Sequence, residues 1–410
     1  MSVGTRQVTR EVTSGSLARP GWALIIWCDP LETGGVTQAV LNLAIQMNVL
    51  GVYRPVVIVK EWAAVRPRLE MRDGVQYVFI RMRDPPDDPA PLYQQVRNSL
   101  LAWPENRRVL RLMRELDIRV VNSHYPTLAD EMFVAKPAVV GGRPLTVIFS
   151  LHGMDIKGAD VASIEYRTRY INMLSRGSAV VADSHSLADF VTNRLAPDLA
   201  GKVSFIHNGV SAATIQNHDP IETTLPARYI LNVATFETKK GQCYLLDAFS
   251  HIAERYPDLH LVLAGRATAA ANKPILKALR RQVSLLGLDN RVLFFQDIPH
   301  AKIGALYASA TLFCLSSLAE SFPLVLLEAG AFSLPVIATR VDGVPELICQ
   351  NRDGILVDSG DATQLAEGIS ALLDSPDRGR ALAASLHDRV LRNFSWCHAA
   401  ERYLALAASL

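Results

Sequence analysis

Residues 310–339 restrict the fold of this chain more than any other segment. Two apolar runs, residues 310–315 and 335–339, flank a helical pattern that contains Glu328, and Glu320 precedes that pattern. Two buried strands joined by a helix form a βαβ unit with parallel strands. Because ligands bind at the carboxyl ends of such strands, Glu320 is expected in a loop at a ligand crevice and Glu328 about two turns into the helix.

The two carboxylates of this unit indicate a ligand that is rich in hydroxyl groups. An ionised carboxylate accepts several hydrogen bonds at once, and neutral hydroxyl groups are suitable donors. The positions of Glu320 and Glu328 therefore predict a polyhydroxylated ligand, such as a ribose together with a hexose.

The same alternation of apolar runs and helical patterns extends along most of the chain. It predicts an α/β fold of two doubly wound, Rossmann-like domains, whose parallel sheets face a cleft between the domains. With 410 residues the chain is long enough for two cores. Further buried strands are expected at residues 22–27, 54–59, 76–80, 120–123, 145–151, 179–184, 203–206, 229–233, 259–264 and 292–295.

Composition shifts along the chain predict the domain boundaries. The polar residues 1–19 are expected to form a flexible tail, and the polar residues 211–227 a linker. The N-terminal domain is predicted over residues 20–210 and the C-terminal domain over residues 228–389. Residues 390–410 are predicted to form a C-terminal helix that packs back on the N-terminal domain.

Charge and cysteine content exclude several classes of protein. The formal net charge of +2 gives no argument for a nucleic-acid partner. The five cysteines are scattered without a Cys-x-x-Cys pair, which predicts neither a disulfide framework nor a zinc site and favours a reducing compartment. Residues 1–19 lack the apolar core of a signal peptide, and no run of about 18 apolar residues predicts a spanning helix. A cytoplasmic location is expected.

Two glycines and a lysine follow predicted strands. Gly34 and Gly35 precede a helical pattern, where a glycine backbone and free N–H groups allow close approach of a diphosphate or a sugar. Lys240 lies in Lys-Lys-Gly before another helix and could neutralise a diphosphate. The alternatives are a plain tight turn for the glycines and a solvated surface loop for the lysine. No Gly-x-Gly-x-x-Gly after a strand and no Walker A sequence are present.

Two histidines also stand at the ends of predicted strands. His124 follows residues 120–123, and His152 opens the sequence His-Gly-Met-Asp, which ends at Asp155. Both would lie at the cleft, where a histidine can donate to a sugar hydroxyl or stabilise charge. The alternative is a structural hydrogen-bonding role. Neither histidine has acidic or histidine partners at metal-ligand spacing.

With these motifs in place, the chain resembles a family 4 glycosyltransferase of GT-B architecture from about Trp22 to its end. The most specific part is Ser-Ser-x-x-Glu-Ser-Phe-Pro-x-x-x-x-Glu-Ala, which begins at Ser316. Residues 334–338 and the Gly-Val-Pro-Glu sequence ending at Glu346 continue the match. Residues 208–210 and 351–357 are also similar to family motifs.

The resemblance implies retaining transfer of a hexose from a nucleotide sugar, without a metal ion or cofactor. It implies that the N-terminal domain binds the acceptor and the C-terminal domain the nucleotide sugar. In that arrangement Glu320 holds the hexose, Glu328 the ribose, Lys240 the diphosphate, and His124 contacts the sugar near the reacting centre. The candidate residues are His124, Glu320 and Lys240 for catalysis; Gly35, Lys240, Arg266, Glu320, Phe322, Pro323, Leu324 and Glu328 for the donor; and Gly34, His152 and Asp155 for the acceptor or sugar.

The chain departs from the family pattern at two places. Ala234-Thr235 stands where the family usually has Gly-Arg, so the arginine partner of Lys240 is missing. Arg266, which follows a neighbouring strand, is a candidate to compensate. Gln296 stands where a glycine is common, which leaves the loop that recognises the base undetermined.

The expected partners are a UDP- or GDP-sugar and a glycan, lipid-linked or small-molecule acceptor, with no nucleic acid. The alternative is a non-catalytic GT-B protein that binds a nucleotide sugar or serves as a scaffold, which only Thr235 supports. A third interpretation is a GT-B epimerase or phosphorylase, but the sequence contains no segment specific to either. A basic helix face could place the protein on anionic lipid at the inner membrane, although a solvated face on a surface helix is the favoured interpretation. That face carries Arg107, Arg108, Arg111 and Arg114.

Overall fold

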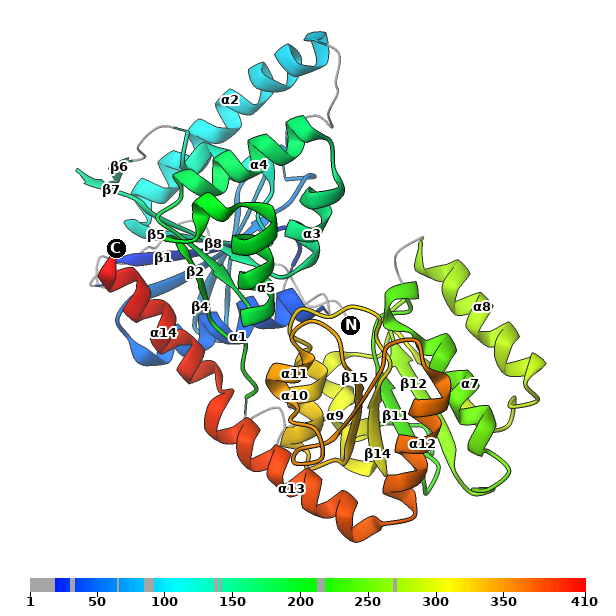
Figure 1. Ribbon diagram of the computed structural model, residues 1–410. Coiled ribbons are helices and arrows are strands. Elements are labelled where there is room, and N and C mark those ends of the chain that lie inside the picture. Colours follow the sequence, from blue (N-terminus) through cyan, green and yellow to red (C-terminus); the bar gives the residue numbers. More distant parts are fainter. Residues whose placement is uncertain are drawn as a thin grey trace, which may run out of the picture.

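The computed structural model describes residues 19–29, 34–64, 66–84, 92–135, 139–140, 142–211, 218–267 and 271–410. Figure 1 shows two α/β domains, with the helices α13 and α14 running from the C-terminal domain along one side of the N-terminal domain. The predicted tail, apart from Arg19, and residues 212–217 of the predicted linker lie outside the described residues.

The N-terminal domain is built on an eight-stranded sheet of order β10-β9-β8-β5-β1-β2-β4-β3 within the described residues. Its strands are β1 (Gly21–Ile26), β2 (Arg54–Lys60), β3 (Arg68–Arg72), β4 (Val75–Ile80), β5 (Ile118–His124), β8 (Thr146–Leu151), β9 (Ala179–Ala182) and β10 (Val203–Phe205). The helices are α1 (Gly35–Leu50), α2 (Leu92–Glu115), α3 (Met154–Val161), α4 (Ile164–Arg176) and α5 (His185–Phe190). A small hairpin comprises β6 (Val139–Val140) and β7 (Arg143–Pro144).

The C-terminal domain contains a six-stranded sheet of order β13-β12-β11-β14-β15-β16, with every pair parallel. Its strands are β11 (Tyr229–Val233), β12 (His260–Gly265), β13 (Val292–Gln296), β14 (Leu312–Leu315), β15 (Val336–Thr339) and β16 (Ile355–Val357). Its helices are α7 (Gln242–Ile252), α8 (Asn272–Leu285), α9 (His300–Ser309), α10 (Leu324–Ala331), α11 (Val344–Leu347), α12 (Ala362–Leu373) and α13 (Pro376–Asn393). The prediction of two doubly wound α/β domains is confirmed.

The strands were visible in the sequence because helices cover both faces of each sheet. In β1 all six residues are buried. Ala23 and Ile25 pack into the core on one face, whereas Trp22, Leu24 and Ile26 pack into the core on the other. A strand that is buried on both faces is continuously apolar, so the sequence marks its position but not which side chain takes which face.

One edge strand, β3, was not predicted. It pairs antiparallel with β4 through a tight hairpin at Asp73 and Gly74, whose φ angles of 49° and 74° are left-handed. Leu69 and Met71 of β3 are both exposed. Because its apolar residues are not buried, β3 lacks the apolar pattern that identified the inner strands.

The last helix of the chain belongs structurally to the N-terminal domain. Helix α13 ends at Asn393, and α14 (Trp396–Ser409) begins after Ser395, whose hydroxyl accepts a hydrogen bond from the His398 N–H. The boundary between α13 and α14 therefore lies at residues 394–395, whereas the last helix was predicted to begin at residue 390. Trp396 and Tyr403 of α14 are buried in the same core as β1, and Figure 1 shows α14 alongside this domain.

Helix α2 has the amphipathic face that was predicted. Val109, Leu112, Met113 and Leu116 at its end are buried. The four arginines of the opposite face are exposed: Arg107, Arg108, Arg111 and Arg114. Within the described ranges, no helix has the length and apolar content needed to cross a membrane.

Candidate active site

A cavity of about 280 Å³, which opens to solvent, lies between the two domains. Loops at the carboxyl ends of both sheets form its walls. The N-terminal domain contributes Gly34, Gly35, Val36, Gln38, His152, Asp183 and Asn208. The C-terminal domain contributes Val233, Ala234, Thr235, Lys240, Gly265, Arg266, Ile298, Ile303, Glu320, Ser321, Phe322, Pro323, Leu324, Val325 and Glu328.

All of the candidate site residues except His124 and Asp155 line this cavity. They come from segments far apart in the sequence, and the parallel topology brings these segments to one edge of each sheet. The candidates that line the cavity are Gly34, Gly35, His152, Lys240, Arg266, Glu320, Phe322, Pro323, Leu324 and Glu328.

Lys240 and Glu320 form an ion pair inside this cavity. The Lys240 Nζ lies 2.7 Å from the Glu320 Oε1, and the hydroxyl of Ser317 donates to the same oxygen at 2.7 Å. The Lys240 side chain is only 18% exposed, so it is not the solvated surface lysine of the alternative interpretation. A cation and a hydrogen-bond acceptor are thus held side by side.

The backbone around Lys240 is tied to the loop that carries Glu320. The Ser316 hydroxyl donates to the Lys240 carbonyl at 3.0 Å. Gly241 has a φ of 61°, and a Cβ atom there would lie 2.0 Å from the Ser316 carbonyl oxygen. Only glycine fits this position, which lets the lysine loop and the glutamate loop approach each other.

Glu328 is oriented by a buried tyrosine. The Tyr307 hydroxyl, on α9, donates to the Glu328 Oε2 at 2.8 Å. Burial and the charge of Glu328 raise the pKa of Tyr307 well above its ordinary value, so the phenol stays protonated and remains a donor. The carboxylate of Glu328 is therefore fixed at the cavity wall, where it can accept hydrogen bonds from a ligand.

Thr235, which replaces the arginine of the family pattern, and Arg266, the candidate to compensate, both line the cavity. Thr235 follows β11 and Arg266 follows β12, and both line the wall next to Lys240. The backbone N–H of Phe236 donates to the Arg266 carbonyl at 3.1 Å, which holds the two loops together. Arg266 therefore lies in the same cavity as Lys240.

His124 does not line the cavity. Its ring is buried, and its Nδ1 lies 3.1 Å from the Nε2 of His152, on which it stacks. Burial and the neighbouring His152 lower the pKa of His124 well below its ordinary value. His152, which contacts His124, lines the cavity, and the contact between His124 and the sugar stays a prediction.

Asp155 also faces away from the cavity. Its carboxylate accepts hydrogen bonds from the backbone N–H groups of His152 at 3.1 Å and of Ile156 at 3.0 Å. Burial raises the pKa of Asp155 to about 6. Asp155 is not among the residues that line the cavity, and its contact with acceptor or sugar stays a prediction. Asp155 instead shapes the loop that presents His152.

Four polar residues of the cavity were not selected from the sequence: Gln38, Asp183, Asn208 and Ser321. Asp183 follows β9, and it accepts a hydrogen bond from the Ser321 hydroxyl of the other domain. A polar residue at the carboxyl end of a buried strand was the signal that selected His124, and the same signal applies to Asp183.

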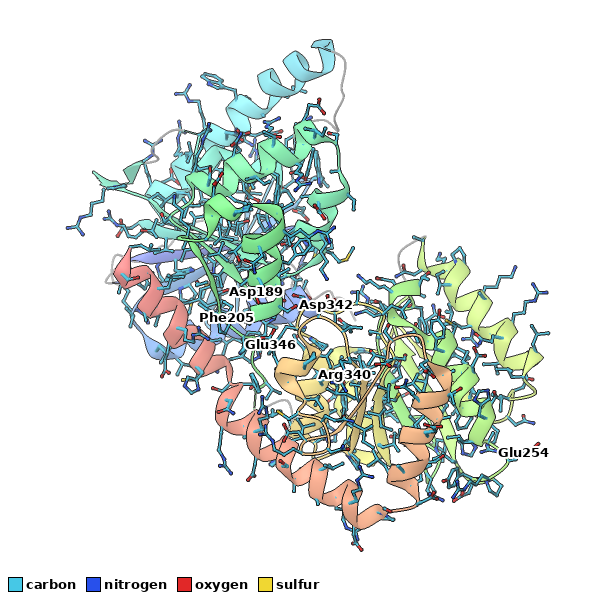
Figure 2. All side chains as sticks on the ribbon, in the orientation of Figure 1. Asp189, Phe205, Glu254, Arg340, Asp342 and Glu346 are labelled. Atoms are coloured by element: carbon cyan, nitrogen blue, oxygen red, sulfur yellow. The ribbon has the colours of Figure 1, made fainter. Side chains whose placement is uncertain are left out.

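A second set of contacts joins the domains beside the cavity. The Glu346 carboxylate accepts hydrogen bonds from the backbone N–H groups of His185 and Ser186, at 2.9 and 2.8 Å, and lies 2.8 Å from the His207 Nε2. Burial opposes ionisation of Glu346, but these hydrogen bonds prevail and lower its pKa. In Figure 2, Asp342 and Glu346 lie on the side of the C-terminal domain that faces the N-terminal domain.

Two family models together match most of the chain. A family model described as "Glycosyltransferase Family 4" matches residues 33–214, and one described as "Glycosyl transferases group 1" matches residues 215–386. The chain is 31% identical over 205 residues to a D-inositol 3-phosphate glycosyltransferase of Corynebacterium urealyticum. That match covers 49% of this chain and 48% of the relative, so the chain spans about half the length of this curated relative.

Solved structures share the arrangement of the two domains. Sucrose-phosphate synthase from Thermosynechococcus elongatus matches with a TM-score of 0.77 and 20% identity, over 95% of this chain and 99% of that chain. HepE of Anabaena, solved in complex with UDP-glucose, matches with a TM-score of 0.72 and 18% identity, over 95% of this chain and 100% of that chain. These likenesses establish the architecture of the chain.

Proposed function

Since the chain belongs to the family 4 glycosyltransferases and has the GT-B fold, we propose that it is a retaining hexosyltransferase that uses a nucleotide sugar. The acceptor is a glycan, a lipid-linked sugar or a small molecule, and the product belongs to polysaccharide or glycoconjugate synthesis. The observation that carries the proposal is the Lys240–Glu320 pair at 2.7 Å in a cavity that also contains Glu328.

In the proposed complex the C-terminal wall binds the donor. Glu328 accepts hydrogen bonds from the ribose hydroxyls, and Glu320 holds a hydroxyl of the hexose. Lys240 and the first turn of α10, at Leu324, lie at the diphosphate. As the glycosidic bond breaks, negative charge grows on the diphosphate, and cations and N–H groups that are already in place stabilise it without rearranging.

We propose that this transfer needs no metal ion, because Lys240 and Arg266 supply positive charge at the diphosphate. Glu320 is engaged by Lys240 and Ser317, which suits a residue that positions a hydroxyl rather than one that attacks the sugar. Fixing the donor in this way converts binding into alignment of the reacting atoms.

Replacing Arg266 with alanine tests whether this residue supplies the missing cation. We expect a loss of kcat of about tenfold to a hundredfold, since a partner cation at the diphosphate is removed. The melting temperature should stay close to that of the wild type, because Arg266 is partly exposed at the cavity wall. Arg266→Lys is the matched control and should retain most of the activity. A fully active Arg266→Ala variant would refute the compensation.

The acceptor is proposed to bind at the carboxyl ends of strands β1 and β5, where two aromatic residues lie. Trp27 follows β1, is 51% exposed, and its ring lies 6.1 Å from that of Tyr125, which follows the neighbouring strand β5. Burial, assisted by nearby charges that include Glu237 of the C-terminal domain, raises the pKa of Tyr125 to about 12. Flat rings with polar edges suit the apolar faces of sugar rings.

A Trp27→Ala variant should therefore bind the acceptor less well. We expect the acceptor KM to rise about tenfold, which corresponds to about 1.4 kcal/mol of binding. Hydrolysis of the donor without acceptor should not change. Trp103→Ala is the matched control, because Trp103 is also exposed but lies on α2. An acceptor KM that responds equally to both substitutions would argue against this acceptor surface.

The class of reaction is tested with a panel of UDP- and GDP-sugars, by thermal shift and by release of nucleotide. A donor that stabilises the protein and is slowly hydrolysed supports the glycosyltransferase and names its donor. Selective stabilisation without nucleotide release, even with acceptors present, would favour the non-catalytic nucleotide-sugar-binding protein, for which Thr235 at the diphosphate wall is the supporting residue.

A further inference from the structure

Asp183 is a buried carboxylate of the cavity to which the proposed transfer gives no role. It is 6% exposed and stands at the carboxyl end of β9 in the N-terminal domain. Its two oxygens face different partners. The Oδ1 accepts a hydrogen bond from the Ser321 hydroxyl, and the Oδ2 lies 3.7 Å from the Nδ1 of His152. Asp183 thus touches one residue from each wall of the cavity.

Ser321 occupies the centre of the loop that binds the donor in the proposed complex. Its neighbour Glu320 is held by Lys240 of its own domain, whereas its neighbour Phe322 stacks on His207 of the N-terminal domain, with ring centroids 4.7 Å apart. Ser321 itself is held by Asp183. The loop is therefore fixed in part by the N-terminal domain, and those contacts exist only while the domains are together.

The loop that carries His152 meets Ser321 directly. A Cβ atom placed on Gly153 would come within 2.9 Å of the Ser321 Cβ. The hydroxyl of Ser321 is therefore confined between the His152 loop and the Asp183 carboxylate. A shift of the domains relative to each other would separate Ser321 from both at once.

The other oxygen of Asp183 faces the ring of His152. His152 Nε2 lies 3.1 Å from His124 Nδ1, so one proton occupies the space between these nitrogens. A carboxylate opposite the His152 Nδ1 favours the tautomer with a proton on that nitrogen. The His152 Nε2 then accepts from the His124 Nδ1–H, which gives one direction of donation from His124 through His152 towards Asp183.

We propose that Asp183 is a positioning residue that couples closure of the two domains to the orientation of His152 at the cavity. When the domains close, Ser321 reaches Asp183, and the same carboxylate holds His152 in one tautomer and one ring orientation. The loop of Glu320 and the histidine are thereby aligned together. This proposal deepens the glycosyl transfer proposed above and rests on it.

The substitution Asp183→Asn separates the two roles of the carboxylate. An asparagine oxygen can still accept from Ser321, but the charge opposite His152 is lost. We expect kcat to fall by about tenfold to a hundredfold, as small misplacements of reacting groups do. The Kd for the free nucleoside diphosphate should stay within about twofold, because the nucleotide contacts are in the C-terminal domain. Unchanged kcat and KM in this variant would overturn the proposal.

Ser321→Ala and Lys157→Gln supply the comparison. Ser321→Ala keeps the charge of Asp183 but removes its hydrogen bond to the other domain. The double variant Ser321→Ala/Asp183→Asn should lose no more kcat than the more impaired of the two single variants. Lys157→Gln breaks a different contact between the domains, the 2.9 Å ion pair with Asp342 outside the cavity, and should retain wild-type kcat. An equal loss in Lys157→Gln would overturn the specific role of Asp183.

A second readout does not depend on transfer. Nuclear magnetic resonance of the protein labelled with ¹⁵N in its histidine side chains reports the tautomer of His152. We expect the proton on Nδ1 in the wild type and a changed pattern in Asp183→Asn. The same tautomer in both proteins would overturn the proposal even if transfer is active. The expected change in a protein that turns over no donor would support the Asp183–His152 contact and refute the proposed function instead.

Discussion

Lys240→Ala is expected to lower kcat for sugar transfer by about 10²- to 10³-fold, the cost of removing one preorganised group that stabilises developing charge. Lys240 is the cation closest to Glu320, at 2.7 Å, and its backbone is tied to the glutamate loop. Without it, the diphosphate would leave with less stabilisation. The carboxylate of Glu320 would also lose its cationic partner and repel the diphosphate.

Lys239 provides the matched control for this prediction. It is adjacent in the sequence and has the same charge, but it pairs with Glu237 at 3.1 Å and does not line the cavity. Lys239→Ala should change kcat by less than about twofold, since an exposed ion pair contributes little. Adding Glu320→Gln to Lys240→Ala should restore nucleotide binding in part, but not kcat. Steady-state kinetics with the donor found in the panel decides the matter. Similar kcat values for Lys239→Ala and Lys240→Ala would contradict the role of Lys240.

Trp396→Ala is expected to destabilise the protein by about 3–5 kcal/mol, the usual cost of removing a large aromatic side chain from a core. Trp396 is buried with residues of β1, although the sequence places it near the opposite end of the chain. Next to it, the Val210 N–H donates to the Phe394 carbonyl at 2.9 Å, where the chain passes between the domains a second time. The substitution leaves a cavity at this junction.

Denaturant unfolding followed by circular dichroism measures this effect. His398→Ala on the same helix is the matched control, because His398 is exposed and should change the free energy of unfolding by less than about 0.5 kcal/mol. The loss in Trp396→Ala should appear in the unfolding of the N-terminal domain, since α14 packs there. A loss below about 1 kcal/mol would mean that α14 contributes little to that domain.

The architecture and the residues that the C-terminal domain contributes to the cavity were largely predictable from the sequence. Buried parallel strands are continuously apolar, and the residue after each strand must lie at one edge of the sheet. Lys240 after β11, Arg266 after β12 and Glu320 after β14 could therefore be assigned to one cavity before any contact was known. These residues share a domain, so local topology was enough to bring them together.

The residues contributed by the N-terminal domain were predicted less well. His124 and His152 both follow strands, and nothing in the sequence distinguishes the buried histidine from the one that lines the cavity. The two histidines differ because β5 and β8 are neighbours in the sheet. The ring of His124 is therefore packed against the ring of His152, and only His152 reaches the cavity. Asp155 was selected by its place beside His152, but it satisfies the N–H groups of its own loop.

The sequence by itself determined the two α/β domains, the positions of most strands and the acidic and basic residues that the C-terminal domain contributes to the cavity, because a strand buried on both faces leaves a continuous apolar pattern. Tertiary structure alone decided that Ser321 meets Asp183 and that His152 contacts His124. Each of these contacts joins segments that no periodicity connects. They depend on how the two folded domains approach each other and on side-chain packing in three dimensions.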